Sequence, residues 1–278
     1  MISATQWIFG SEPLETTASR LMRLGYDGVE LSGEPDSYTA DAVRAVVEPK
    51  GLAVTSICGI YTPARDLSHP SREIRGAAVG YVRACAALAA ALDASVVIVV
   101  PTAVGRIGPE AEEGAERRWA VESIREASGF AEQVGVRLVI EALNRYESYL
   151  VNSLEAAAQL AADVGRPNVG IMADLFHMNI EEASLPDAIR SVAPLIWHVH
   201  LADSNRRAPG LGHTDFRTLI DVLAEIGYEG ALTMEFLPPT ANPYLAASLD
   251  VPEPEKTASS TQALEFVRSL LTPQAPDG

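Results

Sequence analysis

The chain alternates short apolar runs with longer stretches in which apolar residues recur every three or four positions. The short runs are rich in Val, Ile and Leu, and several are almost continuously apolar, which is typical of strands buried on both faces. The pattern predicts eight strands, over 3–9, 28–31, 53–58, 95–100, 137–141, 169–174, 196–201 and 231–236. Runs of this kind indicate a parallel sheet that helices cover on its outer side.

The longer stretches have the periodicity of helices, and several end at a glycine, as helices commonly do. They predict helices over 15–24, 40–48, 72–92, 115–134, 154–164, 185–192, 216–226 and 254–271. Strict alternation of eight strands with eight helices favours a closed (β/α)8 TIM barrel over a doubly wound sheet. The sequence contains neither GxxxxGK[ST] nor GxGxxG, so a phosphate-loop or dinucleotide-binding protein is not expected.

Length and composition fit one barrel. The chain has 278 residues and no Gly/Ser-rich linker, and a barrel of this kind takes about 250 residues. We therefore expect a single TIM-barrel domain over 1–278. The apolar stretch 86–100 is interrupted by Asp93 and Ser95, which argues against a membrane helix. The first 15 residues lack the basic and apolar regions of a signal peptide, and the two cysteines form no CxxC motif, so we expect a cytoplasmic protein.

The charge is strongly negative. Thirty-seven acidic residues against 21 basic ones give a net charge of −16. A surface of this sign repels nucleic-acid backbones and anionic membranes, so we expect neither as a partner. With nucleic acid and anionic membranes set aside, a small molecule is the expected ligand.

Four metal-ligand residue types stand at the ends of four successive predicted strands: Glu141, Asp174, His200 and Glu235. Their spacings of 33, 26 and 35 residues each match about one strand and one helix. Because a barrel arranges successive strand ends in a ring around one opening, these side chains should converge. Each acid taken alone could equally cap the next helix. Three carboxylates with an imidazole suit Mn²⁺, Co²⁺ or Mg²⁺ better than a structural zinc site.

Further polar residues lie close to these four. His198 and His200 share one face of a strand, and His200 is nearer the strand end, so it is the preferred ligand and His198 a supporting residue. His177, Glu147 and Arg206 lie in the segments that follow the predicted strands, and we expect them to contact substrate.

Three other predicted strands end in residues of interest. Trp7 could form an apolar wall for a sugar ring or pack in the barrel core. Cys58 could line the pocket or fill a small buried space. Glu30 is a candidate to support the metal ligands from behind.

Three segments resemble the signature stretches of the xylose isomerase-like sugar phosphate isomerase/epimerase family. They are IEALNRYESYLVNS, ADLFHMNIEE and HVHLADSNRRAPGLGHTDF, and the likeness is strongest to D-tagatose/D-allulose 3-epimerases and 3-keto-glycoside epimerases. The resemblance implies a divalent-metal-dependent epimerase that inverts a carbon next to the carbonyl of a ketose or keto-sugar. Two glutamates would transfer the proton through a cis-enediolate. It also implies a homo-oligomer, a dimer or tetramer.

The resemblance assigns roles to matching positions. It implies four metal ligands, Glu141, Asp174, His200 and Glu235, with Mn²⁺ as the first expectation and Co²⁺ or Mg²⁺ as alternatives. Glu141 and Glu235 would also be the catalytic acid and base. Substrate would contact Glu147, His177 and Arg206.

Other functions remain open from the sequence. The same residues could serve a lyase or deglycosidase that acts on 3-keto-glycosides (C- or O-glycosides) by metal-assisted β-elimination. The Pro-rich loop 237–254, longer than the connection expected in simple ketose epimerases, could hold an aglycone or a partner subunit. An endonuclease would need additional zinc ligands and is opposed by the charge. A non-catalytic sugar-binding module would not need two acids on one metal.

Overall fold

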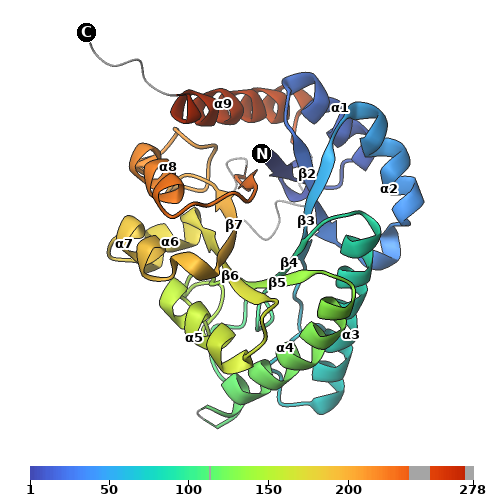
Figure 1. The fold of residues 1–278 in the computed structure, drawn as a ribbon, viewed down its shortest axis with the longest axis vertical. Helices are drawn as coiled ribbons and strands as arrows, with labels where there is room; N and C mark the ends of the chain where they lie inside the picture. Colours follow the sequence, from blue (N-terminus) through green and yellow to red (C-terminus); the bar gives the residue numbers. More distant parts are fainter. Residues whose placement is uncertain (113, 238–250, 273–278) are drawn as a thin grey trace.

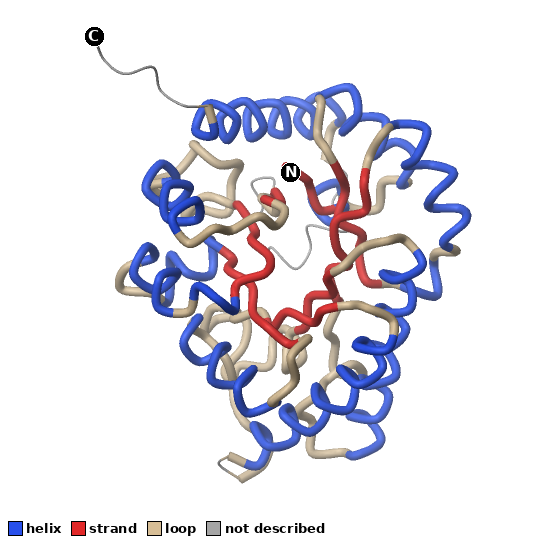
Figure 2. The backbone as a smooth tube through the Cα atoms, viewed as in Figure 1, coloured by secondary structure: helices blue, strands red, loops and turns tan. Residues whose placement is uncertain are grey.

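The computed structural model describes residues 1–112, 114–237 and 251–272. Eight strands form a closed parallel barrel in sequence order, and helices surround it (Figures 1 and 2). The barrel closes where β1 pairs with β8, with Ile2 opposite Leu232 and Ala4 opposite Met234. The predicted (β/α)8 barrel is therefore confirmed. Most of the loop predicted to bear on the substrate, 237–254, lies outside the described residues.

The predicted strands and helices agree closely with the observed ones. The strands are β1 Ile2–Thr5, β2 Gly28–Gly33, β3 Ala53–Gly59, β4 Val96–Val99, β5 Arg137–Ile140, β6 Val169–Asp174, β7 Ile196–Leu201 and β8 Leu232–Met234. The α-helices are α1 Leu14–Leu24, α2 Ala40–Val47, α3 Arg72–Ala91, α4 Ala115–Gln133, α5 Leu154–Val164, α6 Leu175–Glu181, α7 Leu185–Ser191, α8 Phe216–Glu225 and α9 Glu253–Leu271. Asp215 caps α8, because its side chain accepts a hydrogen bond from the Thr218 amide.

Two local predictions were wrong. The first strand ends at Thr5, because the chain turns into a 3₁₀ helix, η1 Gln6–Phe9, so Trp7 does not lie on a strand. A glycine in the left-handed region, Gly10 with φ 64°, ends this turn. The helix α6 was not expected; it follows β6 with no intervening loop and has only seven residues, too few to show a periodicity.

One helix in the described part of the chain, α3, is long and apolar enough by length and composition alone to cross a membrane. In the barrel α3 contacts β3, β4 and α4, and its buried residues include Val79, Val82 and Cys85. A helix that packs on the core of a protein can have the same length and hydropathy as a membrane helix, so these two properties of α3 do not indicate contact with a membrane.

The interior of the barrel is divided between an apolar and a polar half. Side chains of β4, β5 and β6 form a separate apolar cluster, made of Val96, Ile98, Val139 and Met172. On the other side of the interior the side chains are polar and hydrogen-bonded to one another. Ser3 bonds to Thr233 at 2.7 Å, and Ser56 donates to Glu30 at 2.6 Å. The polar half forms the floor beneath the barrel mouth.

A buried arginine joins the two ends of the chain. The Arg20 side chain on α1 is 0% exposed and donates two hydrogen bonds to the buried carboxylate of Glu12, at 2.5 and 2.7 Å. It also pairs with Glu253 at the start of α9, and its guanidinium lies over the Phe9 ring. The pair thus holds α9 against the segment that follows β1.

We predict that Arg20→Met lowers the free energy of unfolding in urea by about 3–5 kcal/mol, because it removes both guanidinium hydrogen bonds from the Glu12 carboxylate, which keeps only Lys256 and Thr17 as partners. Arg166→Met is the matched control, since Arg166 and Glu132 are both exposed and lie 3.7 Å apart; its loss should stay below about 1 kcal/mol. Equal losses for the two variants would contradict this role of Arg20.

Candidate active site

The structure brings the four strand-end residues together at the barrel mouth. Glu141 directly follows β5, Asp174 ends β6, His200 lies in β7 and Glu235 directly follows β8. All four are buried, and a ligand atom from each lies within 4.8 Å of the others. A group of three carboxylates and one imidazole at this density has the donor chemistry of a divalent-cation site.

The two oxygens of Asp174 face different ways. Oδ1 accepts hydrogen bonds from the amides of Phe176 (2.8 Å) and His177 (3.1 Å), so Asp174 caps α6. Oδ2 is buried, makes no hydrogen bond within the described residues, and lies 3.6 Å from Nδ1 of His200. The helix-capping interpretation and the ligand interpretation are therefore compatible for this residue.

His200 is oriented from behind by Glu30. Its Nε2 lies 3.1 and 3.2 Å from the two carboxylate oxygens of Glu30, which also contacts Nε2 of His198 at 2.8 Å. Nδ1 of His200 points the other way, 3.4 Å from Glu235, and has no hydrogen-bond partner among the described residues. A carboxylate on one imidazole nitrogen that leaves the other free is the usual arrangement around a histidine ligand. Glu30 and His198 thus occupy the supporting positions expected from the sequence.

The buried acids differ in proton affinity. Burial and the neighbouring Glu235 raise the pKa of Glu141 well above its usual range, and burial raises the pKa of Glu235 to about 7. Burial alone would raise the pKa of Glu30 as well, but His200 and His198 hold it well below its usual range. Burial opposes the charged form of His200, yet Glu30 and Glu235 raise the pKa of its imidazole well above its usual value. Without a cation, the cluster therefore retains protons near neutral pH.

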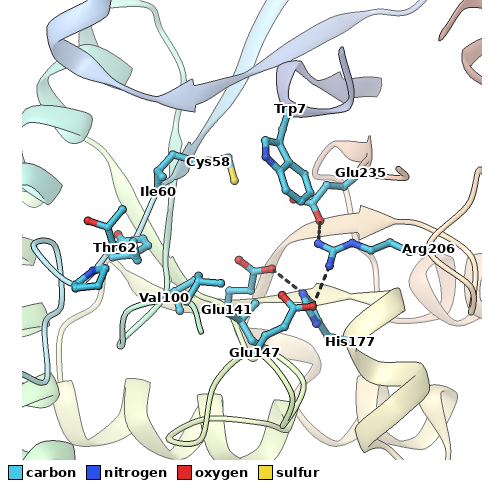
Figure 3. A pocket seen from close by; sticks show the side chains of 15 residues that line it. Trp7, Cys58, Ile60, Thr62, Val100, Glu141, Glu147, His177, Arg206 and Glu235 are labelled. Atoms are coloured by element: carbon cyan, nitrogen blue, oxygen red, sulfur yellow. Dashed lines mark hydrogen bonds and ion pairs between the residues drawn. The ribbon is translucent and has the colours of Figure 1, made fainter. Parts of the chain in front are cut away.

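Arg206 extends over the pocket from the loop after β7 (Figure 3). Its backbone has φ 61°, which is strained for a residue other than glycine. The guanidinium lies between the rings of Trp7 and Phe176, 5.2 and 4.7 Å from their centroids. It pairs with Glu147 at 2.9 Å and lies 3.9 Å from Glu235. Three of these contacts involve residues singled out from the sequence, whereas Phe176 was missed.

His177 has a defined tautomer. Its Nδ1 accepts a hydrogen bond from the backbone amide of Asn144 at 3.1 Å, so the neutral ring carries its proton on Nε2. That atom lies 3.9 Å from Glu141. Burial lowers the pKa of the ring, which favours the neutral form. His177 lies in α6 rather than in a loop. Asn144 was not singled out from the sequence, although it lies in the segment EALNRYE with Glu141 and Glu147. Its side chain donates a hydrogen bond to Glu147 at 3.0 Å.

These residues form one side of a pocket of about 390 Å³. Glu141, Glu147, His177, Arg206 and Glu235 line that side, and Figure 3 shows them grouped across the cavity from Cys58, Ile60 and Thr62. The remaining lining is Trp7, Gly59, Tyr61, Pro63, Val100, Val104 and Leu143. The pocket is therefore polar toward β5–β8 and mainly apolar toward β3 and β4. His213 is outside this lining; it bonds to Ser204 at 2.8 Å.

Comparison with known proteins agrees with this geometry. Residues 19–269 match the family model of the xylose isomerase-like TIM barrel. The chain is 31% identical to a D-psicose 3-epimerase of Agrobacterium fabrum over 78% of its length and 76% of the relative, and 31% identical to a 3-dehydro-D-guloside 4-epimerase of Escherichia coli over 77% and 84%. The solved structure of a D-psicose 3-epimerase with D-tagatose from Clostridium cellulolyticum H10 superposes with a TM-score of 0.88 at 26% identity, covering 98% of this chain and 99% of that one.

We predict that binding of Mn²⁺ to the four-residue cluster releases about one proton or more at pH 7. The cause is the raised pKa of Glu141, Glu235 and His200, whose protons a cation must displace. Because these protons are lost as pH rises, the affinity for Mn²⁺ should increase from pH 6 to pH 8. Titration calorimetry in two buffers of different ionisation enthalpy measures both quantities. A buffer-independent binding heat and a constant affinity would contradict the assignment.

Proposed function

The chain belongs to the xylose isomerase-like TIM-barrel family and is a sugar isomerase/epimerase, and on this premise we propose that it is a divalent-metal-dependent epimerase. The reaction would invert a carbon next to the carbonyl of a ketose or keto-sugar. One observation carries the proposal: two buried glutamates with raised pKa, Glu141 and Glu235, face the same cluster from β5 and β8. A carboxyl group whose pKa is raised toward neutral, as that of Glu235 is to about 7, can both give and take a proton at physiological pH.

The cation would be held by Glu141, Asp174, Nδ1 of His200 and Glu235. The unpaired Asp174 Oδ2 and His200 Nδ1 support this fit, because buried polar atoms are seldom left without a partner. A bound divalent ion would act as a Lewis acid toward the substrate carbonyl. We propose Mn²⁺, with Co²⁺ and Mg²⁺ as alternatives, because oxygen-rich sites with one imidazole favour these ions over structural zinc.

The two glutamates would perform the proton transfer. One carboxylate removes the proton from the carbon next to the carbonyl, which gives an enediolate. The other carboxyl group returns a proton to the opposite face of that carbon and so inverts it. Glu141 and Glu235 follow strands that are separated in the barrel by β6 and β7, which places them at different points around the mouth.

Three further residues would position the substrate. The Nε2 proton of His177 and the Arg206 guanidinium are donors that favour a substrate oxygen as it gains negative charge. Glu147 accepts from Arg206 and Asn144, and its carboxylate would accept from a sugar hydroxyl. The rings that enclose Arg206 restrict its motion, so that its position is set before substrate binds.

A lyase would use the same enediolate but expel a substituent on the next carbon instead of accepting a proton. Product analysis with a 3-keto-glycoside distinguishes the two reactions. An epimeric glycoside supports the epimerase, and a free aglycone supports the lyase.

We predict that Glu141→Gln and Glu235→Gln each lower kcat by about 10²–10⁴-fold or more, because each removes a proton-transfer group. In the wild-type protein, deuterium from D₂O should enter the inverted carbon during turnover. Glu155→Gln on the exposed side of α5 is the matched control and should retain full activity. Wild-type turnover without deuterium incorporation, or an active Glu235→Gln variant, would refute the two-glutamate scheme.

We predict that dialysis against a chelator abolishes activity and that Mn²⁺ or Co²⁺ restores it, with metal content measured in parallel. The chelated protein should keep its fold, because the barrel and its hydrogen bonds do not depend on the cluster alone. Full activity in a sample shown to be free of metal would reject the role of the cation.

A further inference from the structure

A second cavity of about 450 Å³ lies beside the first, and both are lined by Pro63 and Val104. It lies between the loops that follow β3 and β4. The amide of Val104 bonds to the Tyr61 carbonyl at 3.1 Å, which fixes the two loops to each other at the boundary between the cavities. A ligand seated at the metal cluster and extending past this boundary would reach the second cavity.

The wall of the second cavity is held by a buried ion network. Arg106 pairs with Asp66 at 2.9 Å and with Glu116, at the start of α4, at 2.5 Å, and all three side chains are at least nine-tenths buried. Tyr149, from the segment after β5, also donates to Glu116. Three successive loops are thus tied to one arginine, which makes this wall a rigid part of the mouth.

The charges around the cavity select against anions. Asp66 and Glu110 line it and Glu116 lies behind it, while the single arginine is already paired twice. A phosphate or carboxylate would meet this acidic surface without a free cation to bind it. A neutral ligand is favoured.

The available groups fit a sugar ring. Nδ1 of His69 accepts from the Ser71 amide at 2.9 Å, so in the neutral ring Nε2 carries the proton and is a donor. Nε2 lies 3.7 Å from the Glu110 carboxylate, which is an acceptor. Apolar side chains also line this cavity, including Ile107, which is 65% exposed. One donor, one acceptor and apolar contact surface match a polyhydroxylated ring, which has C–H faces and hydroxyl edges.

We propose that the second cavity binds a second sugar ring, and that the substrate is a keto-sugar joined to it by a glycosidic bond. The proposal rests on the proposed function for the position of the reacting ring. The mainly apolar half of the first pocket supports it, since Ile60, Val100 and Val104 offer no partner for sugar hydroxyls and the Tyr61 hydroxyl already donates to the Ile98 carbonyl, which leaves Thr62 and Cys58 as the polar side chains there. A glycoside would instead pass this apolar stretch and reach hydrogen-bonding groups beyond it.

The test compares a 3-keto-disaccharide with the methyl glycoside of the same keto-sugar. With wild-type protein, kcat/KM for deuterium exchange at the reacting carbon should be about tenfold or more higher for the disaccharide. Ile107→Trp, which fills the second cavity only, should remove this advantage and leave the methyl glycoside within about twofold. His69→Asn keeps an acceptor for the Ser71 amide but removes the ring donor, so it should lower the disaccharide value alone. Met22→Trp, at an exposed apolar position on α1, is the matched control.

Equal kcat/KM values for the two substrates, or an equal loss for both in Ile107→Trp, would overturn the second sugar site. Exchange with neither substrate nor any free ketose would refute the proposed function instead. In that event calorimetry decides the site separately: the disaccharide should bind about tenfold more tightly than the methyl glycoside, and Ile107→Trp should abolish the difference. Equal affinities would overturn it.

Discussion

The burial of three carboxylates and an imidazole within 4.8 Å of one another is the constraint on which the barrel mouth depends. Like charges at this separation in a buried site repel strongly and favour protonation or a bound cation. The residues around the cluster hold some of these ligand atoms in place. Glu30 holds His200 from below, and the amides at the start of α6 bond to one oxygen of Asp174. The other oxygen of Asp174 and Nδ1 of His200 are left facing the cluster.

The same constraint explains the surrounding strain. Arg206 is the nearest arginine to the acids, and it reaches them from a left-handed backbone conformation that favours glycine. Its ring contacts and its pair with Glu147 offset the cost of that conformation. A positive charge above the acids and a neutral His177 beside them give the pocket one strongly polar side. The opposite side of the pocket has no cluster of charged groups and is mainly apolar. It can therefore accept the part of a substrate that does not react.

Much of this could be predicted from the sequence because it follows from periodicity. Strand ends recur at one strand-plus-helix interval, so the convergence of Glu141, Asp174, His200 and Glu235 follows once the barrel is assumed. Glu30 could be named as a candidate supporting residue from its place at a strand end, but its specific partner His200 could not, because β2 and β7 are not neighbours and the two residues are 170 positions apart. The helix α6 was missed because it follows β6 directly and its seven residues are too few to show a helical periodicity. Trp7 was assigned to a strand because an apolar 3₁₀ turn continues the apolar pattern of β1.

Anomalous diffraction from crystals soaked in Mn²⁺ would locate the cation independently of activity. We expect one strong peak among Glu141, Asp174, Glu235 and Nδ1 of His200. The buried triad of Glu30, His198 and His200 also has metal-ligand residue types and is the natural competing position. A peak at that triad, or the absence of a peak in the four-residue cluster, would refute the assignment of Glu141, Asp174, His200 and Glu235 as metal ligands.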